Sequence, residues 1–477
     1  MTVLSSKIIL VCIKRREVDL TLHVITQILG VPDTQEGRLP VSGISIDSRT
    51  LTRGMLFFAL KGEKSDGHFF VREALKKGAS AAVVDRHWIS QHKNGQEGIL
   101  IPVKNPLVAL QEVASYYRKR FRFPVIAVTG TNGKTTTKEM LSAVLGMKYS
   151  VAKSEGNFNN HIGLPLSICA WDNTNTMAVL EMGTNHFGEI RRLCEIARPT
   201  HGVITNVGKG HLEFFGDLKG VLRAKAELVD FLKDRGTVFL NGDDFHLQSF
   251  KGIVPQTFMY GFSENYDFSG EELGTDPSGF PKMRMGEAEV TIRVPGSYNL
   301  SNGLAAAAVG RHFGVSWEAI KHALESFRPM DKRMTFVRFS GMTVFNDTYN
   351  ANPTSVQQAL NTLKERQEGK RKIVVLGDML ELGKRSRKEH QNIGDCVVQL
   401  GLDAFFGFGP AMRSATDRAC KLGMNAVVHS ESKSDVVEKL LRFVRDGDVI
   451  LIKGSRGMKM EEIVAGLQEG SKGEKKE

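Results

Sequence analysis

A glycine-rich turn between an apolar run and a helical phrase limits the fold of this chain more than any other feature. The run is Pro-Val-Ile-Ala-Val at residues 124–128, the turn carries Gly130 and Gly133, and the helical phrase starts near Lys134. A turn of this kind aims backbone N–H groups and the positive end of a helix at one anion. The segment therefore predicts a parallel-sheet domain of the P-loop mononucleotide-binding type, with phosphate held at the turn.

The residues of the turn fit a nucleoside triphosphate. Val128 stands where the full GxxxxGKS/T loop has its first glycine, so the chain carries the shorter form GTNGKT. Its lysine can reach the β- and γ-phosphates, and a threonine hydroxyl after it can hold Mg²⁺. A chance glycine-rich turn is the alternative, which the flanking strand and helix disfavour. The predicted ATP contacts of the loop are Gly130, Thr131, Asn132, Gly133, Lys134, Thr135 and Thr136.

The pattern along the 477 residues predicts an α/β chain with about three domains. Residues 18–106 read as a small domain of short strands and helices, and residues 107–327 hold the glycine-rich turn. Residues 328–470 alternate apolar runs with helical phrases, which is typical of a doubly wound, Rossmann-like domain. Residues 243–295 read as a small β-rich insertion, and the polar segment 469–477 is expected to be disordered.

The basic excess of the chain, a net charge of +11, fits an anionic substrate such as a nucleotide. The charges are scattered, and no basic stripe is interleaved with the aromatic residues, which make up 8% of the chain. Nucleic acid is therefore not an expected partner. A P-loop protein that binds nucleic acid is kept as an alternative, which strong salt-dependent DNA binding would support.

Cysteine usage and hydropathy favour the cytoplasm. The five cysteines are odd in number and widely spaced, with no CxxC pair, as expected in a reducing compartment. The apolar run Ile8–Ile13 is too short for a signal peptide or a membrane helix, and no later run is long enough. We therefore expect no membrane insertion, and residues 1–17 are assigned no function.

The phosphate loop and the phrases that follow it in order resemble the Mur ligase and folylpolyglutamate synthase superfamily, from about residue 40 to about residue 460. In that superfamily ATP activates a carboxylate, which an amine then attacks, so the resemblance implies ATP and Mg²⁺ as cofactors. It also implies a catalytic set of Lys134, Glu181, His211 and Lys225. The magnesium ligands that it implies are Thr135, Glu181, His211 and Lys225, the last as a carbamate formed with CO₂.

Without the resemblance, the sequence supports a metal-binding role for these residues to different degrees. Glu181 ends an apolar strand beside the strand of the loop, and its carboxylate suits a hard cation. His211 follows a strand end and a glycine-rich turn, a position that favours function, but a structural histidine fits the same pattern. Lys225 by itself reads as a solvated helix lysine.

The resemblance adds further nucleotide and substrate contacts. EGNFNNHIGLPLSI resembles the family's asparagine-rich substrate loop and SYNLSNGLAAAA its adenine-contacting helix start, although a polar turn and a helix cap would look the same. An arginine after the second linker implies a phosphate contact, and the acid in NDTYNANP implies a ribose contact. The implied residues are Asn157, Asn159 and Asn160 for the substrate, and Asn299, Asn302, Arg333 and Asp347 for ATP.

Phrases near the C-terminus distinguish members of the family. NDTYNANPTS, VVLGDMLELG and ILIKGSR resemble the members that add D-alanyl-D-alanine, and the sequence lacks the Asp-Asn-Pro-Arg motif typical of diaminopimelate-adding members. His390 is given no definite role. Two interpretations stay open for the basic loop that holds Lys453, Ser455 and Arg456. The loop contacts phosphate or substrate, or it only turns the chain. The substrate contacts implied in this region are Tyr349, Asn350, Asn352 and Pro353.

The N-terminal phrase SIDSRTLTRGMLFFALKG resembles the UDP-binding domain of the members that add the third amino acid and the dipeptide. Ser48 and Arg49 are the predicted uridine or diphosphate contacts. Arginine suits a diphosphate because its guanidinium makes paired, charge-assisted hydrogen bonds. A turn capped by Asp47 is the alternative for each residue taken singly.

The resemblance as a whole implies a cytoplasmic monomer that serves peptidoglycan synthesis. It would join D-alanyl-D-alanine to UDP-N-acetylmuramoyl-tripeptide through an acyl phosphate, giving the pentapeptide precursor, ADP and phosphate. Another amino acid-adding Mur ligase, a folate-extending ligase and a non-catalytic nucleotide-binding regulator are the alternatives. The sequence leaves open the third residue of the tripeptide, the tolerance for other dipeptides and the carbamylation of Lys225.

Overall fold

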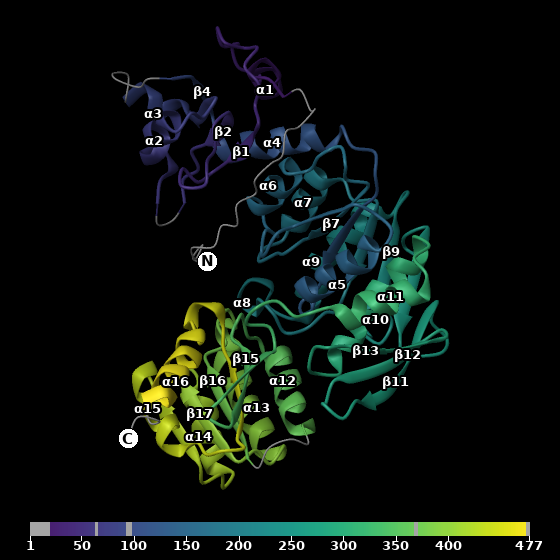
Figure 1. Cartoon of the computed structure of the whole chain (residues 1–477), viewed down its shortest axis with the longest axis vertical. Coiled ribbons are helices and arrows are strands. Elements are labelled where there is room, and N and C mark those ends of the chain that lie inside the picture. Colours follow the sequence, from purple (N-terminus) through teal and green to yellow (C-terminus); the bar gives the residue numbers. More distant parts are fainter. Residues whose placement is uncertain (1–19, 63–64, 92–97, 367–370, 474–477) are drawn as a thin grey trace.

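The computed structural model describes residues 20–62, 65–91, 98–366 and 371–473. Over these ranges the chain builds three sheets in succession, of four, nine and six strands. The N-terminal sheet lies at one end of the molecule and the C-terminal sheet at the other, with the large central sheet between them (Figure 1). The α/β architecture predicted from the pattern is confirmed. The interpretations of residues 1–17, including the run Ile8–Ile13, lie outside the described residues.

The N-terminal sheet is small, and its strands pair in parallel. Every residue of β2 and most of β3 are buried, which explains why these strands read as continuous apolar runs. The strand order is β1 (Gly43–Ser45), β2 (Met55–Phe58), β3 (Ala81–Asp85) and β4 (Leu100–Val103). The helices are α1 (Leu22–Leu29), α2 (Val71–Lys76) and α3 (Arg86–Gln91), with a 3₁₀ turn, η1, at Gly67–Phe70.

The central sheet carries the phosphate loop at its middle. β5 (Val125–Thr129) lies between β7 (Met177–Glu181) and β8 (His201–Ile204) and runs parallel to both. β6 (Val151–Lys153) ends the sheet beyond β7, and β9 (Thr237–Asn241) continues it beyond β8. Because parallel strands end at one edge, the residues that follow β5, β7 and β8 meet there, as expected for a ligand site.

The β-rich segment 243–295 is the edge of this sheet rather than a separate insertion. β10 pairs in parallel with β9, β11 pairs with β10, and β12 and β13 follow as antiparallel strands. Strand pairing between distant segments leaves no local pattern, so the sequence indicated the strands but not their continuity with the sheet. The bounds are β10 (Gln256–Gly261), β11 (Phe268–Thr275), β12 (Pro281–Met285) and β13 (Ala288–Thr291).

Helices cover the central sheet and connect its strands. α5 begins at Lys134 directly after the phosphate loop and packs along α10, whose buried alanines allow close approach. The helices are α4 (Pro106–Arg118), α5 (Lys134–Gly146), α6 (Gly163–Cys169), α7 (Glu189–Ala197), α8 (Leu212–Phe215), α9 (Leu218–Leu232), η2 (Leu247–Phe250), α10 (Tyr298–His312) and α11 (Trp317–Ser326). α8 faces the C-terminal domain (Figure 1).

The C-terminal sheet is parallel except for its first strand. β14 is antiparallel to β15, and the remaining neighbours run parallel, which is the Rossmann-like arrangement predicted. The strand order is β14 (Thr335–Phe339), β15 (Met342–Asp347), β19 (Val449–Lys453), β16 (Lys372–Gly377), β17 (Ala404–Phe408) and β18 (Val427–Ser430). The helices are α12 (Pro353–Glu365), η3 (Gly383–Arg385), α13 (Ser386–Gln399), α14 (Arg413–Lys421), α15 (Lys433–Phe443), η4 (Arg456–Met458) and α16 (Glu461–Gly473).

The two faces of the C-terminal sheet bury alternate residues of each strand. Ile373 and Phe406 belong to a core shared with α15 and α16, whereas Val374 and Phe405 belong to the core shared with α12, α13 and α14. Successive side chains of a strand point to opposite faces, so a strand covered on both sides is apolar throughout. The predicted strands at 342–346, 372–376, 404–408, 426–429 and 449–453 are therefore recovered to within a residue at each end.

Two further predictions concern the C-terminal end of the chain and membrane-spanning helices. The predicted disorder of 469–477 is wrong for residues 469–473, which continue α16, and residues 474–477 lie outside the described residues. Ser471 Oγ donates to the Leu467 carbonyl at 2.7 Å, so a buried hydroxyl is satisfied inside this last turn. In the described part of the chain, no helix is both long and apolar enough to cross a membrane.

Candidate active site

A cleft of about 2990 Å³ runs along all three domains. It opens at the carboxyl ends of β5, β7, β8 and β15, the edge where a parallel α/β sheet binds its ligands. Of the predicted residues, Gly130, Lys225 and Pro353 lie outside its lining. Those that line it are Ser48, Arg49, Thr131, Asn132, Gly133, Lys134, Thr135, Thr136, Asn157, Asn159, Asn160, Glu181, His211, Asn299, Asn302, Arg333, Asp347, Tyr349, Asn350 and Asn352.

The phosphate loop needs its two glycines for space and for backbone geometry. Gly130 has φ 145°, and a Cβ there would lie 2.0 Å from Thr205 Oγ1. Gly133 has φ 78°, and a Cβ there would lie 2.4 Å from Asn302 Oδ1. Side chains rarely adopt this half of φ space, and neither position has room for one. Asn206 Oδ1 accepts from the Asn132 N–H at 2.9 Å, which ties the loop to the end of β8.

Lys134 is folded onto the loop that precedes it. Its ammonium donates to the carbonyls of Gly130 and Thr131, both at 2.9 Å. Burial lowers the pKa of Lys134, and the opposing charge of Glu181 partly offsets this. An anion held by the loop would favour the charged form of the lysine for the same electrostatic reason.

Glu181 is buried at the end of β7 beside the loop. One carboxylate oxygen, Oε1, accepts from Asn159 Nδ2 at 2.7 Å. The other, Oε2, is buried and has no hydrogen-bond partner among the described residues. A buried carboxylate oxygen without a donor is costly unless a cation or another ligand completes the site. The donor set therefore fits a hard cation at Glu181.

Lys225 lies on α9 and is 2% exposed, so the interpretation as a solvated helix lysine is wrong. Burial, followed by the charge of Lys134, lowers the pKa of Lys225 well below its ordinary value. The lowered pKa favours the uncharged, nucleophilic form of its amine. This is the chemical state that adds to CO₂.

His211 precedes α8 with φ 53°, a left-handed conformation that is uncommon for a residue with a side chain. Its Nδ1 lies 2.6 Å from Glu381 Oε2, which comes from the C-terminal domain. A carboxylate only accepts, so Nδ1 carries a proton, and in the neutral tautomer with this bond the lone pair is on Nε2. The imidazole is thus oriented by a residue of another domain.

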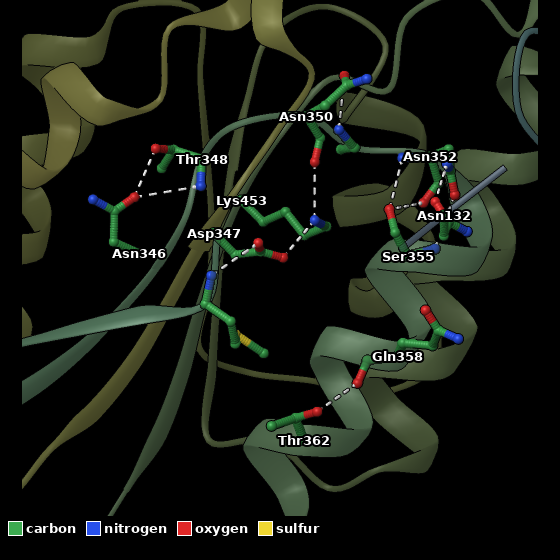
Figure 2. Close-up of polar contacts among 12 residues, drawn as sticks. Asn132, Asn346, Asp347, Thr348, Asn350, Asn352, Ser355, Gln358, Thr362 and Lys453 are labelled. Atoms are coloured by element: carbon green, nitrogen blue, oxygen red, sulfur yellow. Dashed lines mark hydrogen bonds and ion pairs between the residues drawn. The ribbon is translucent and has the colours of Figure 1, made fainter. Parts of the chain in front are cut away.

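The C-terminal domain also reaches the phosphate loop directly. Asn352 Nδ2 donates to Asn132 Oδ1 at 2.8 Å (Figure 2), and Arg333 donates to Thr135 Oγ1 at 2.9 Å. The guanidinium of Arg333 lies 3.9 Å from the centre of the Tyr349 ring, within cation–π range. These contacts bring Arg333, predicted to contact phosphate, and Asn352, predicted to contact substrate, to the phosphate loop.

The loop after β15 is held by Lys453. Its ammonium lies 2.5 Å from Asp347 Oδ2 and donates to the Asn350 carbonyl at 2.9 Å (Figure 2). Asp347, predicted to contact ribose, is therefore occupied by a lysine in this structure. Asn352 Oδ1 accepts from the Ser355 N–H at 2.9 Å and caps α12, which begins at the buried Pro353. These bonds hold the loop at both of its ends.

Three predicted asparagines make structural bonds at helix starts. Asn299 Nδ2 donates to the Pro295 carbonyl at 2.8 Å, and its Oδ1 accepts from Asn302 at 2.9 Å. Asn160 Oδ1 accepts from the Gly163 N–H at 2.9 Å. Each of these side chains lines the cleft. The helix-cap alternative for Asn299 and Asn302 is wrong, because α10 begins after Ser297 with no side-chain cap, whereas Asn160 sits in the polar turn that was its alternative. Asn157, in contrast, is exposed to the cleft.

At the far end of the cleft, Arg49 pairs with Asp47. Arg49 makes hydrogen bonds of 2.6–3.2 Å to both Asp47 oxygens, yet its side chain is 69% exposed. Ser48 is buried, and its carbonyl accepts from Lys77 at 2.9 Å. The turn expected around Asp47 is present, and the guanidinium remains open to a ligand in the cleft.

The sequence as a whole matches three family models. The Mur ligase family catalytic domain matches residues 40–118, the Mur ligase middle domain residues 128–310, and the Mur ligase glutamate ligase domain residues 332–456. The chain belongs to the Mur ligase family. The resemblance inferred from the phosphate loop and the later phrases is confirmed.

Individual Mur ligases are similar along nearly the whole chain. UDP-N-acetylmuramoyl-tripeptide–D-alanyl-D-alanine ligase of Bacillus subtilis is 37% identical over 432 residues, 90% of this chain and 93% of that protein. MurF from Acinetobacter baumannii superimposes with a TM-score of 0.83 at 29% identity, covering 94% of this chain and 99% of its own. MurF ligase from Thermotoga maritima in complex with ADP gives 0.78 at 28% identity, covering 91% and 98%.

Sequence reasoning missed several residues that organise the site of this Mur ligase. Lys138 is fully buried one helical turn after Lys134, a spacing that could have drawn attention to it. Glu381 lies in the phrase VVLGDMLELG, where nothing local marks its contact with His211. Asn206 follows β8, a strand-end position that favours ligand or loop contacts.

Two residues whose roles the sequence left open make structural hydrogen bonds. His390 is fully buried; its Nδ1 donates to the Ser386 carbonyl at 2.7 Å and its Nε2 accepts from the Met379 N–H at 3.1 Å. Ser455 Oγ accepts from the Leu380 N–H at 2.8 Å and donates to the Ala351 carbonyl at 3.1 Å. Both hold loops at the carboxyl edge of the C-terminal sheet.

Proposed function

We propose that this chain joins D-alanyl-D-alanine to UDP-N-acetylmuramoyl-tripeptide at the expense of ATP. The observation that carries the proposal is the bond from Asn352 to Asn132. It brings the phrase that distinguishes D-alanyl-D-alanine-adding members onto the loop that holds ATP. The printed names of the full-length relatives support the same substrate pair.

All three domains line the cleft, which supports a separate part for each in the reaction. We propose that residues 18–106 hold the UDP end through Ser48 and Arg49, residues 107–327 hold ATP, and residues 328–470 bring the dipeptide. The predicted adenine contacts at the start of α10 and the asparagines of the substrate loop belong to the same proposal. We further propose that the enzyme acts as a monomer in the cytoplasm.

Magnesium fits the donors at the nucleotide end. We propose that Thr135, Glu181 and His211 hold it, with Lys225 as a carbamate. Among the described residues no three His, Cys, Asp or Glu side chains form a ready-made metal cluster, so phosphate oxygens and the carbamate would complete the ligand set. When bound, the metal offsets the repulsion between the substrate carboxylate and the triphosphate.

The carbamate would form on the uncharged amine of Lys225. The nitrogen lone pair adds to the carbon of CO₂, a C–N bond forms, and one proton is released to solvent. The product carries a negative charge where the reacting amine carried none. Lys134, whose charge acts on Lys225, would stabilise that anion.

Ligation then proceeds in two displacements. An oxygen of the tripeptide carboxylate attacks the γ-phosphorus, the bond from that phosphorus to the β-phosphate bridging oxygen breaks, and ADP leaves. Lys134 and Arg333 stabilise the charge on the transferring group. The dipeptide amine next attacks the acyl carbon, the amine loses a proton, and phosphate departs with the bonding pair. No protein nucleophile is required.

The test is phosphate release from ATP and Mg²⁺ with the tripeptide nucleotide present and D-alanyl-D-alanine added or omitted. We expect release to require both substrates and to yield a pentapeptide by mass. K134A should lower kcat by about 100-fold or more while the protein stays folded, because a charge at the transferring phosphoryl is lost. The exposed lysine variant K233A is the matched control and should retain turnover.

Release that requires a single amino acid, or a folate with glutamate, would replace the proposal with another ligase of the superfamily. ATP binding without turnover under any of these conditions would instead indicate a regulator. Both commonly occurring tripeptides, ending in diaminopimelate or lysine, belong in the assay because the third residue is open.

A further inference from the structure

The contact between His211 and Glu381 joins two loops from different domains. Besides the bond of 2.6 Å between Nδ1 and Oε2, the Glu213 N–H donates to the Glu381 carbonyl at 3.0 Å. Gly383 packs so closely that a Cβ there would lie 3.2 Å from Glu213 Cα. The two loops are therefore docked by backbone as well as by side chains.

Both residues of the pair have a left-handed backbone. His211 has φ 53° and Glu381 has φ 62°. For residues with a side chain this conformation is uncommon, and it persists where the surrounding structure holds it. Two such residues bonded to each other across a domain boundary indicate a built contact, not an incidental surface approach.

We propose that Glu381 is a positioning residue for the metal site: it orients the His211 imidazole so that Nε2 faces the cation, and it does so once the C-terminal domain has docked. The inference rests on the proposed function, because the cation is the one that would accompany ATP. Carboxylates that accept the second N–H of a ligating histidine fix its tautomer and ring plane. Here that carboxylate is supplied by another domain.

In this arrangement, docking of the C-terminal domain on the central domain would complete the cation site. Without the Glu381 carboxylate, the imidazole would be free to rotate or to carry its proton on Nε2, and the cation site would be incomplete. Docking of the C-terminal domain would therefore increase the affinity for the cation. In the docked arrangement Arg333 and Asn352 also reach the phosphate loop. The acyl phosphate would form when the cleft is closed against water.

The chain offers a matched control at the same interface. Lys209, two residues before His211, is bonded by both oxygens of Glu389 at 2.9 and 3.0 Å. Glu389 is a C-terminal-domain carboxylate that contacts the same central-domain loop but not the imidazole. Removing either carboxylate weakens docking, whereas removing Glu381 alone releases the histidine.

The experiment measures Mn²⁺ binding by electron paramagnetic resonance in the presence of ADP, using the full chain and the variants E381A, E381Q and E389A. We expect E381A to weaken Mn²⁺ binding by about 10- to 100-fold, and E381Q to weaken it less because an amide oxygen still accepts from Nδ1. E389A should weaken Mn²⁺ binding clearly less than E381A does, because it loosens the docked loops but leaves the imidazole bonded to Glu381. Thermal unfolding of each variant shows whether it is folded.

The double variant H211A/E381A tests whether the two residues act together. If Glu381 acts through His211, adding E381A to H211A causes no further loss of Mn²⁺ affinity. In turnover, E381A should raise the Mg²⁺ concentration needed for half-maximal rate more than it lowers kcat at saturating Mg²⁺. Equal Mn²⁺ affinity in E381A and the natural chain, or equal loss in E381A and E389A, would overturn the proposal.

Turnover of the natural chain separates this inference from the proposed function. Dipeptide-dependent turnover without the expected order of Mn²⁺ affinities rejects the role of Glu381 alone. The expected order without dipeptide-dependent turnover rejects the proposed substrates and leaves the positioning of His211 intact.

Discussion

Lys138 Nζ donates to the carbonyl oxygen of Ser154 at 2.6 Å, and the lysine is completely buried. A weaker bond of 3.3 Å reaches the Gly156 carbonyl, and Glu139 lies 2.8 Å away to balance the charge. Ser154 in turn accepts from the Glu181 N–H through its hydroxyl at 2.8 Å. One lysine thus joins the helix of the phosphate loop to the segment that leads into the asparagine-rich loop.

Replacing this lysine should affect both folding and substrate binding. K138M removes the donor from buried carbonyls and is expected to cost about 1–3 kcal/mol of unfolding free energy. The KM for the tripeptide nucleotide should rise more than the KM for ATP, because the asparagine-rich loop loses its anchor. Denaturant unfolding and steady-state kinetics measure the two effects. The control K148M replaces an exposed lysine. Equal effects of K138M and K148M would show that Lys138 does not anchor the asparagine-rich loop.

Asn352 has two separable functions, capping α12 and contacting Asn132. N352D keeps the oxygen that caps the helix but loses the amide donor. We expect its unfolding free energy to stay within about 0.5 kcal/mol of the natural value. Its kcat/KM should fall about tenfold, equivalent to about 1.4 kcal/mol for the lost interdomain bond. Stability and kinetics are measured on the same preparation.

The helix cap Asn105 provides the comparison for that prediction. Its side chain accepts from the Leu107 N–H at 2.9 Å at the start of α4, away from the cleft. N105A should lose about 1 kcal/mol of stability with kcat/KM unchanged. If N352D retained full kcat/KM, the contact with Asn132 would have no part in turnover.

His201 predicts a pH dependence of stability outside the active site. Burial, with a smaller effect of His312, lowers the pKa of His201 to about 4 from 6.5. Between these values the unfolded chain binds the proton and the folded chain does not, so stability rises with pH over this window. Below about pH 6.5 the natural chain should lose stability that H201Q keeps, by roughly 1–3 kcal/mol near pH 4.

Urea unfolding at pH 4.5, 5.5 and 7.5 is the measurement for His201. As the pH falls, the free energy of unfolding of the natural chain should decrease relative to that of H201Q. The variant H87Q alters an exposed histidine and serves as the comparison. A difference that is constant across the three pH values would show that His201 is not held neutral by the fold.

Carbamylation of Lys225 is directly observable. Protein equilibrated with ¹³C-bicarbonate should give a carbamate carbon signal in NMR that K225A lacks. Removing CO₂ should lower turnover, and bicarbonate should restore it in the natural chain but not in K225A. K219A, an exposed lysine of the same helix, should behave as the natural chain does. A natural chain that shows neither the signal nor a bicarbonate effect would show that Lys225 is not carbamylated.

Much of the fold follows from local pattern. The strands read as apolar runs because the helices cover both faces of the sheets, and the phosphate loop is visible because Gly130 and Gly133 have no room for a side chain. Glu181 could be placed because it ends a strand next to β5. Two features could not be predicted: the pairing of β10 with β9 and the helical end of α16. The pattern along the chain suggested an insertion and a disordered tail in their place.

The sequence by itself determined the nucleotide loop, the order of the domains and the side chains at strand ends, because these depend on residues close together in the chain. The tertiary structure decided which distant side chains meet: His211 and Glu381 are 170 residues apart, and Asn132 and Asn352 are 220 apart. It also decided the environment of Lys225, which a helical pattern places in solvent and the packed structure buries. Burial and partnership across domains are set by how separate units pack, and no local periodicity records that.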